Sequence, residues 1–209
     1  MVNIDTVYQR VLALANKEQR GYITPQEFNL FANQAQMDIF EQYFYDLNQF
    51  NRAPGNDIVY ADPVDMLNEK ISLFEVAVGS SEVAGWGMDG DSIVIPSDVY
   101  RLNIIRVSGY PIEILPTKEF NMVRESPLTA PTTKRPIARR DSKGILIREG
   151  IGVVTPATHN INASYIKKPA PVNWTYVVVG EKALSNPNAS DYQDFELHAS
   201  EETKLVIKI

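Results

Sequence analysis

The chain opens with two segments whose apolar residues recur at helical spacing. In the first, Asn3 or Asp5 can cap a helix. Its apolar positions are Ile4, Val7, Val11, Leu14 and Ala15. The second segment begins with Thr24 as a cap, Pro25 at the first helical position and Glu27 in reach of the cap amide. The pattern therefore predicts two consecutive helices, the second running to about residue 50.

The second segment carries more apolar residues than one helix face can hold. Most of them form one broad stripe, but Leu30, Met37 and Tyr45 lie off it. A helix that is apolar on several sides has to be covered on several sides, so the pattern favours a subunit interface. The candidate interface residues are Phe31, Phe40, Tyr43, Phe44 and Leu47.

The polar positions of this segment are mostly amides. No basic residue occurs between Arg20 and Arg52, whereas asparagine and glutamine occur at nine positions. Amides can be buried in hydrogen-bonded contacts at a lower cost than unpaired charges. Two interpretations stay open: a solvated amide face, and a helix packed in a ring of like subunits.

The period of the apolar residues changes after a third, short helix that starts at Asp62-Pro63. Short apolar runs separated by Gly, Pro and Asp-Gly turns predict an antiparallel sheet or a small barrel. The expected strands are 92–95, 102–107, 112–115, 137–139, 145–147, 162–167 and 176–179. Residues 117–120 start a helical turn or two, and the Pro- and Thr-rich segment 125–136 predicts an extended arm or long loop.

The last residues predict a returning helix. Ser200, Glu201 and Glu202 can start it, and apolar residues continue to Ile209 without a cap. We expect a longer gene product in which this helix continues. The fold class is therefore α+β: a helical bundle from residues 1–75, an inserted antiparallel β domain from 76–185, and a C-terminal segment 186–209 that returns to the bundle.

Composition limits the classes of function. The 209 residues carry a formal net charge of −6, which gives no general attraction to nucleic acid or anionic membranes. There is no cysteine, which excludes disulfides, thiolate metal sites and cysteine nucleophiles. We expect no cofactor and no metal. We also expect no membrane contact, since no apolar run approaches the roughly 20 residues of a membrane span.

Candidate chemistry is sparse. The two histidines, His159 and His198, lie in no recognised catalytic arrangement, and a carboxylate pair for a hydrolase, such as Glu113 with Asp141, has no supporting spacing. One basic cluster could contact phosphate or a neighbour's acidic surface. Its candidate contact residues are Arg135, Arg139, Arg140 and Lys143.

Several spaced fragments resemble virion structural proteins of tailed bacteriophages. They are Lys17–Asn29, Ala32–Gln36, Pro96–Leu102, Tyr165–Pro169 and Phe195–Glu202. Their order, with N-terminal helices, a β insertion and a returning helix, is similar to head-to-tail adaptor rings of short-tailed phages. The resemblance implies a non-enzymatic homo-oligomer, commonly of twelve copies, that binds beneath the portal protein and extends the DNA channel. It also implies assembly in the host cytoplasm.

Other functions stay open. Within virion structural proteins, the chain could be a tail tube subunit or a fibre-attachment collar. From other classes, the alternatives are a phage cell-wall hydrolase and a carbohydrate-binding module. Partners under the main hypothesis are further copies of the chain, the portal, other tail or ring proteins, and non-specifically bound DNA in the channel.

Overall fold

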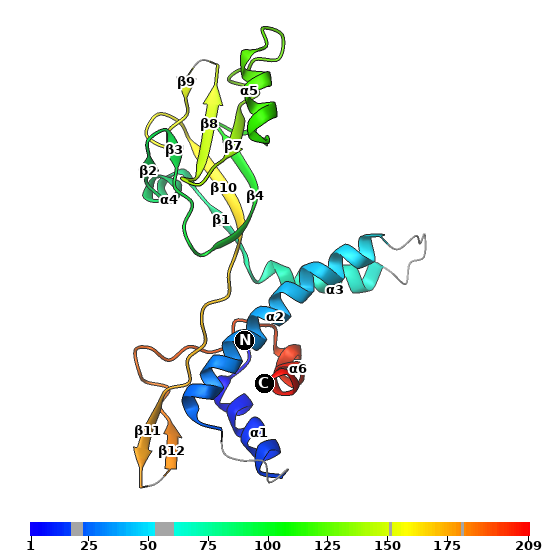
Figure 1. Ribbon diagram of the computed structural model, residues 1–209, viewed down its shortest axis with the longest axis vertical. Coiled ribbons are helices and arrows are strands. Elements are labelled where there is room, and N and C mark those ends of the chain that lie inside the picture. Colours follow the sequence, from blue (N-terminus) through cyan, green and yellow to red (C-terminus); the bar gives the residue numbers. More distant parts are fainter. Residues whose placement is uncertain (18–22, 53–60, 151, 181) are drawn as a thin grey trace. The chain divides into compact units, whose positions relative to one another are not determined.

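The computed structural model describes residues 1–17, 23–52, 61–150, 152–180 and 182–209 (Figure 1). The chain divides into two compact units. The first unit comprises Met1–Phe74 and Pro169–Ile209, and the second comprises Glu75–Lys168. The first is mainly helical and the second mainly β-structure, so the fold is α+β, as the sequence predicts.

Within the residues that the structure describes, the first unit holds four α-helices and one β-hairpin. The helices are α1 (Ile4–Lys17), α2 (Pro25–Arg52), α3 (Ala61–Ser72) and α6 (Glu202–Lys208), and a 3-10 turn, Ala199–Glu201, precedes the last. The hairpin pairs β11 (Tyr176–Val179) with β12 (Lys182–Ser185). The helical hairpin of α1 and α2 and the returning C-terminal helix agree with the sequence analysis.

The predicted cap of α2 is confirmed. Thr24 Oγ1 accepts from the Glu27 amide at 3.3 Å, and Glu27 Oε2 accepts from the Thr24 amide at 3.0 Å. Each end of this capping box satisfies a backbone donor that the first helical turn leaves unpaired. Asn3, one of the two predicted caps of α1, accepts from the Thr6 amide at 3.0 Å.

An aromatic cluster joins the N-terminal helices to the C-terminal part of the chain. The Tyr8 ring of α1 lies 4.9 Å from Phe28 of α2 and 3.9 Å from Trp174, measured between centroids. The Trp174 indole donates to Asp5 Oδ1 at 2.9 Å, so this buried polar group is paired. Residues far apart in the sequence thus share one core.

Three amides of α2 hold the extended segment 170–174 by its backbone; we call Asn29, Asn33 and Gln36 the amide ladder. Asn33 Nδ2 donates to the Val172 carbonyl and Asn33 Oδ1 accepts from the Val172 amide, both at 2.9 Å. Asn29 makes the same two bonds with Trp174, at 3.2 and 2.9 Å. Gln36 Nε2 donates to the Ala170 carbonyl at 2.7 Å.

The spacing of the ladder explains this fit. Positions i, i+4 and i+7 lie on one helix face, and alternate residues of an extended chain turn their backbone groups to the same side. Asn29, Asn33 and Gln36 therefore meet every second residue of the segment. These three amides therefore form hydrogen bonds within the chain. This differs from both earlier interpretations, a solvated amide face and a contact between subunits of a ring.

The described part of the second unit, residues 75–150 and 152–168, is built from two sheets and two short helices. One sheet has the order β1-β10-β4-β5 and the other has the order β2-β3-β8-β7-β6, with β9 paired to β8. The helices are α4 (Ser80–Gly85) and α5 (Thr117–Glu125). The strands are β1 Glu75–Val78, β2 Met88–Asp89, β3 Ser92–Ile93, β4 Val99–Val107, β5 Tyr110–Pro111, β6 Glu113–Ile114, β7 Ile137–Arg140, β8 Ile145–Glu149, β9 Gly152–Val153 and β10 Ile161–Lys167.

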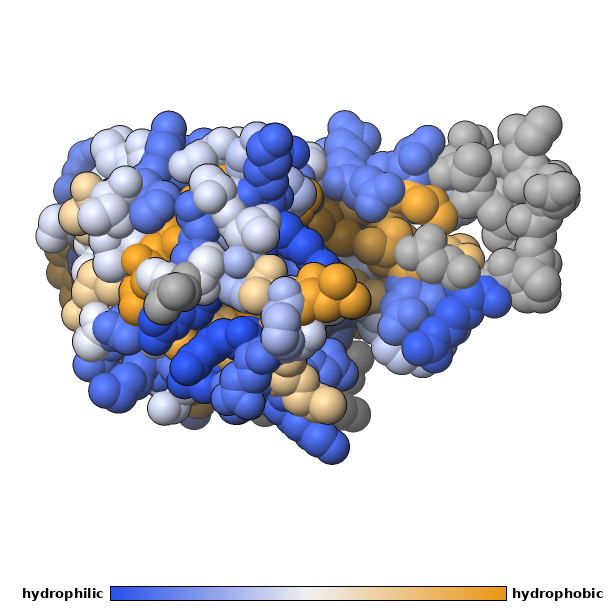
Figure 2. Space-filling model, turned by 90° about the horizontal axis from the view of Figure 1, so that it is seen from above, coloured by the Kyte–Doolittle hydropathy of each residue, from blue (hydrophilic) through white to orange (hydrophobic). Residues whose placement is uncertain are grey.

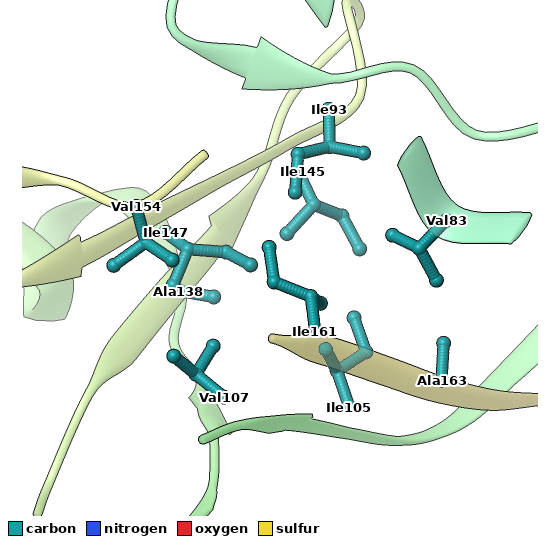
Figure 3. Close-up of a cluster of buried hydrophobic side chains, with 10 residues drawn as sticks. All are labelled: Val83, Ile93, Ile105, Val107, Ala138, Ile145, Ile147, Val154, Ile161 and Ala163. Atoms are coloured by element: carbon teal, nitrogen blue, oxygen red, sulfur yellow. The ribbon is translucent and has the colours of Figure 1, made fainter. Parts of the chain in front are cut away.

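Aliphatic side chains from both sheets and α4 fill the core of the second unit (Figure 3). Ile147, Val154 and Ile161 are almost fully buried there. Gly144 permits the close approach of β8 to β3, since an added Cβ would lie 2.0 Å from the Ile93 carbonyl oxygen. The core of the second unit is therefore built mainly from aliphatic side chains.

Two expectations need correction. The β6–β7 pair is parallel, so the inserted domain is not wholly antiparallel. The insertion also ends at Lys168, and residues 169–185 belong to the first unit. The strand-like sequence of β11 suggested a longer insertion, but the amide ladder ties the chain before β11 to α2.

The ladder yields a stability prediction. Replacing Asn33 with Ala removes the partners of both Val172 backbone groups, and we expect the free energy of unfolding of the first unit to fall by about 1–3 kcal/mol. The measurement is urea unfolding followed by Trp174 fluorescence in a Trp86→Phe background, which leaves one tryptophan.

The matched control is Asn48→Ala, an exposed asparagine on the same helix. We expect it to change the free energy of unfolding by less than about 0.5 kcal/mol. Equal losses in the two variants would contradict the role of the ladder.

Candidate functional site

Two of the predicted interface residues are buried inside the first unit. Phe40 is 0% and Tyr43 2% exposed. The Phe40 ring contacts Phe44 at 5.1 Å and Phe74 at 4.9 Å, measured between centroids. The prediction that Phe40 and Tyr43 face another subunit is therefore wrong, because this chain covers them itself.

Helices α3 and α6 and the turn before α6 supply that cover. Lys70 of α3 forms an ion pair with Glu201, whose side chain is almost fully buried, and the Lys70 ammonium also lies 5.7 Å from the centre of the Tyr43 ring. Burial, reinforced by the nearby Glu201 charge, raises the pKa of the Tyr43 hydroxyl above its usual range. The tyrosine therefore stays neutral and serves packing.

The other candidates retain partial exposure. Phe44 and Leu47 are half-buried, and Phe31 is 46% exposed. Leu30 and Tyr45, which the helical period places off the main stripe, are 69% and 63% exposed. We call Leu30, Phe31 and Tyr45 the outer face of α2, since all three are exposed. At 100° per residue Leu30 and Tyr45 lie on the side away from the buried residues, and Phe31 lies at the flank of the buried stripe.

Exposed apolar residues are not confined to α2. Figure 2 shows hydrophobic residues interspersed among hydrophilic ones on one face of the molecule. In the first unit, Met66 and Leu73 near α3 and four hairpin residues of β11 are also well exposed. Single exposed apolar side chains are ordinary, but a helix face and a complete strand are candidates for contacts with other proteins.

The predicted basic cluster is largely paired with carboxylates. Arg135 lies 3.6 Å from Glu113, and Lys143 lies 3.4 Å from Asp89. The Arg139 guanidinium lies 5.5 Å from the centre of the Phe120 ring, and Arg148, a neighbour in the cluster, lies 3.2 Å from Asp91. These carboxylates reduce the positive field available to a phosphate backbone.

Arg139 and Arg140 form no ion pair with the residues that the structure describes, but Arg139 is half-buried against Phe120, whereas Arg140 is exposed. Contact with phosphate through these residues stays a prediction, with Arg140 as its best-placed cation.

The carboxylates considered for a hydrolase have other partners. Glu113 is exposed beside Arg135, and Asp141 Oδ1 accepts from the amides of Lys143 and Gly144, both at 3.0 Å. Asp141 thus shapes the tight turn between β7 and β8. The two histidines also have local contacts: His159 lies 3.4 Å from Glu149, and His198 Nδ1 accepts from the Ser200 amide at 3.2 Å.

Neither a metal cluster nor a membrane helix emerges from the described part of the chain. No group of three or more His, Asp or Glu side chains there could hold a metal ion. Among the same residues, no helix is long and apolar enough to cross a membrane.

Comparison with known proteins identifies no family for this chain. No protein-family model matches the chain. A search of curated proteins likewise returns no match.

Sequence analysis missed the exposure of the β11–β12 hairpin. The run Tyr176-Val177-Val178-Val179 is predicted as a strand, and continuous apolar strands are usually buried on both faces. In the structure all four residues are exposed. The apolar run itself therefore indicated a contact, but only the tertiary structure shows that the described part of the chain leaves it exposed.

The burial of α2 yields a second prediction. We expect Phe40→Ala to lower the free energy of unfolding of the first unit by about 3–5 kcal/mol, because it empties a fully buried site. Phe31→Ala, on the outer face of the same helix, should cost less than about 1 kcal/mol. Urea unfolding of both variants at a concentration where the protein is monomeric measures the difference, and a larger loss for Phe31→Ala would refute the assignment of faces.

Proposed function

We propose that this protein is a non-enzymatic virion component that forms a homo-oligomeric ring in the head-to-tail connector of a tailed bacteriophage. The ring would link the portal to the tail and extend the DNA channel. Its partners would be further copies of this chain, the portal protein and other tail or ring proteins. The resemblance of the spaced sequence fragments to phage virion proteins supplies the class of protein.

The observation that carries the oligomer is the outer face of α2. Leu30, Phe31 and Tyr45 remain exposed although other positions of the same helix are buried in the unit's own core. Exposed apolar area of this kind is stabilised when another subunit covers it. In a ring the same contact repeats at every subunit, and closed symmetry limits growth. The half-buried Phe44 and Leu47 would lie at the margin of the contact made by the outer face of α2.

Electron microscopy of the purified full chain, alone and with a portal protein, tests the proposal. We expect class averages that show closed rings, with twelve copies as the family resemblance implies, and rings seated on the portal in the mixture. Stacked tubes would instead indicate a tail tube subunit. Monomers in both samples would refute the ring.

A substitution on the outer face sharpens this test. Phe31→Lys should shift the protein from rings to monomers, because it places a charge in the subunit contact. The control is Met122→Lys, a similarly exposed apolar residue on α5 of the second unit. Mass photometry at equal concentrations compares the two, and rings that persist in the Phe31→Lys variant would remove α2 from the interface.

A further inference from the structure

The β11–β12 hairpin is a sheet with two open edges. In the residues that the structure describes, β11 pairs with β12 alone, in the register Tyr176 with Ser185 through Val179 with Lys182. A two-stranded hairpin is marginally stable in water, and each free edge presents unpaired backbone N–H and C=O groups. Such an edge is a template for another strand.

Both faces of the hairpin are apolar as well. Val177, Val179 and Leu184 lie on one face and are 50%, 60% and 52% exposed. Tyr176 and Val178 lie on the other face and are also exposed. The strand β11 contains no lysine, no proline and no bulge, which are the usual means of blocking an edge.

The base of the hairpin is fixed to the core of the first unit. Thr175 and Asn186 are joined by two hydrogen bonds, from Asn186 N to Thr175 O at 2.8 Å and from Thr175 Oγ1 to Asn186 O at 2.6 Å. The Tyr176 ring stacks on Trp174 at 5.6 Å between centroids. The hairpin is therefore presented in a defined orientation, which lowers the entropic cost of binding.

We propose that this hairpin is a strand-pairing contact between copies of the chain, in which the β11 edge of one copy pairs with the β12 edge of the next. The two edges belong to different strands, so one hairpin offers both halves of a head-to-tail contact. Pairing β11 with β11 would leave both β12 edges open. Pairing β11 with β12 satisfies every edge once the ring is closed.

The charge of the hairpin favours a second copy of the chain as the partner that pairs with its edges. Residues 176–185 contain one glutamate and one lysine, so identical hairpins do not repel one another. Zero net charge gives no attraction to a phosphate backbone. The proposal rests on the proposed ring, because a head-to-tail contact closes only in a ring.

The absence of cysteine from the chain permits a clean cross-linking test. Two full-length forms with tags of different length are co-expressed, one with Val178→Cys and the other with Ala183→Cys, and the purified assembly is oxidised. Neighbouring strands lie about 4.8 Å apart, which a disulfide can bridge, whereas strands one further away lie about 9.6 Å apart. We expect a disulfide dimer that contains one form of each length.

A second pair, Val178→Cys with Leu184→Cys, covers a shift of register by one residue, because these two positions come directly opposite each other only after such a shift. Leu128→Cys, the most exposed of the large apolar residues in the described chain at 94%, measures cross-linking by random collision. We expect at least one hairpin pair to exceed this control severalfold, and each cysteine form expressed alone to stay at the control level.

The outcomes separate this inference from the proposed function. Cross-linking of the Val178→Cys form alone would indicate symmetric β11–β11 pairing and overturn head-to-tail contact. Rings visible by electron microscopy without cross-linking above the Leu128→Cys control would overturn the hairpin contact and leave the ring intact. A wild-type protein that is monomeric at every concentration would overturn both.

Discussion

Asn29, Asn33 and Gln36 occupy the place that a neighbouring strand would take in a sheet. Each presents an amide to the backbone of the segment 170–174, and two of them both donate to and accept from one residue. Buried backbone groups need such partners, because leaving them unpaired costs about as much as a lost hydrogen bond. The path of the chain after the second unit depends on these contacts.

Several features follow from that path. The ladder brings Trp174 against Tyr8, so the aromatic core of the first unit forms only when both ends of the chain are present. It also sets the base from which β11 and β12 project. Three polar side chains on one helix therefore position both the aromatic core and the exposed hairpin.

The same arrangement decides which apolar residues remain for other proteins. Phe40 and Tyr43 are buried in the unit's own core, and Lys70 covers that side through its ion pair with the buried Glu201. The apolar residues that remain exposed are Leu30, Phe31 and Tyr45 on α2 and the four residues of β11. Both sets are in the first unit, which places the proposed contacts between copies there, while most of the basic cluster of the second unit is occupied by carboxylates.

The sequence by itself determined the main helices and seven of the strands: Thr24, Pro25 and Glu27 define the start of α2, and short apolar runs between turns define those strands, because these signals act within a few residues. It did not predict β1, α4 or β12. It did indicate that α2 has more apolar residues than one face needs. Only the tertiary structure decided which of them are buried, that amides hold the returning segment, and that β11 is uncovered. These outcomes depend on pairs such as Asn33 and Val172, 139 residues apart, whose meeting is a property of the whole chain path.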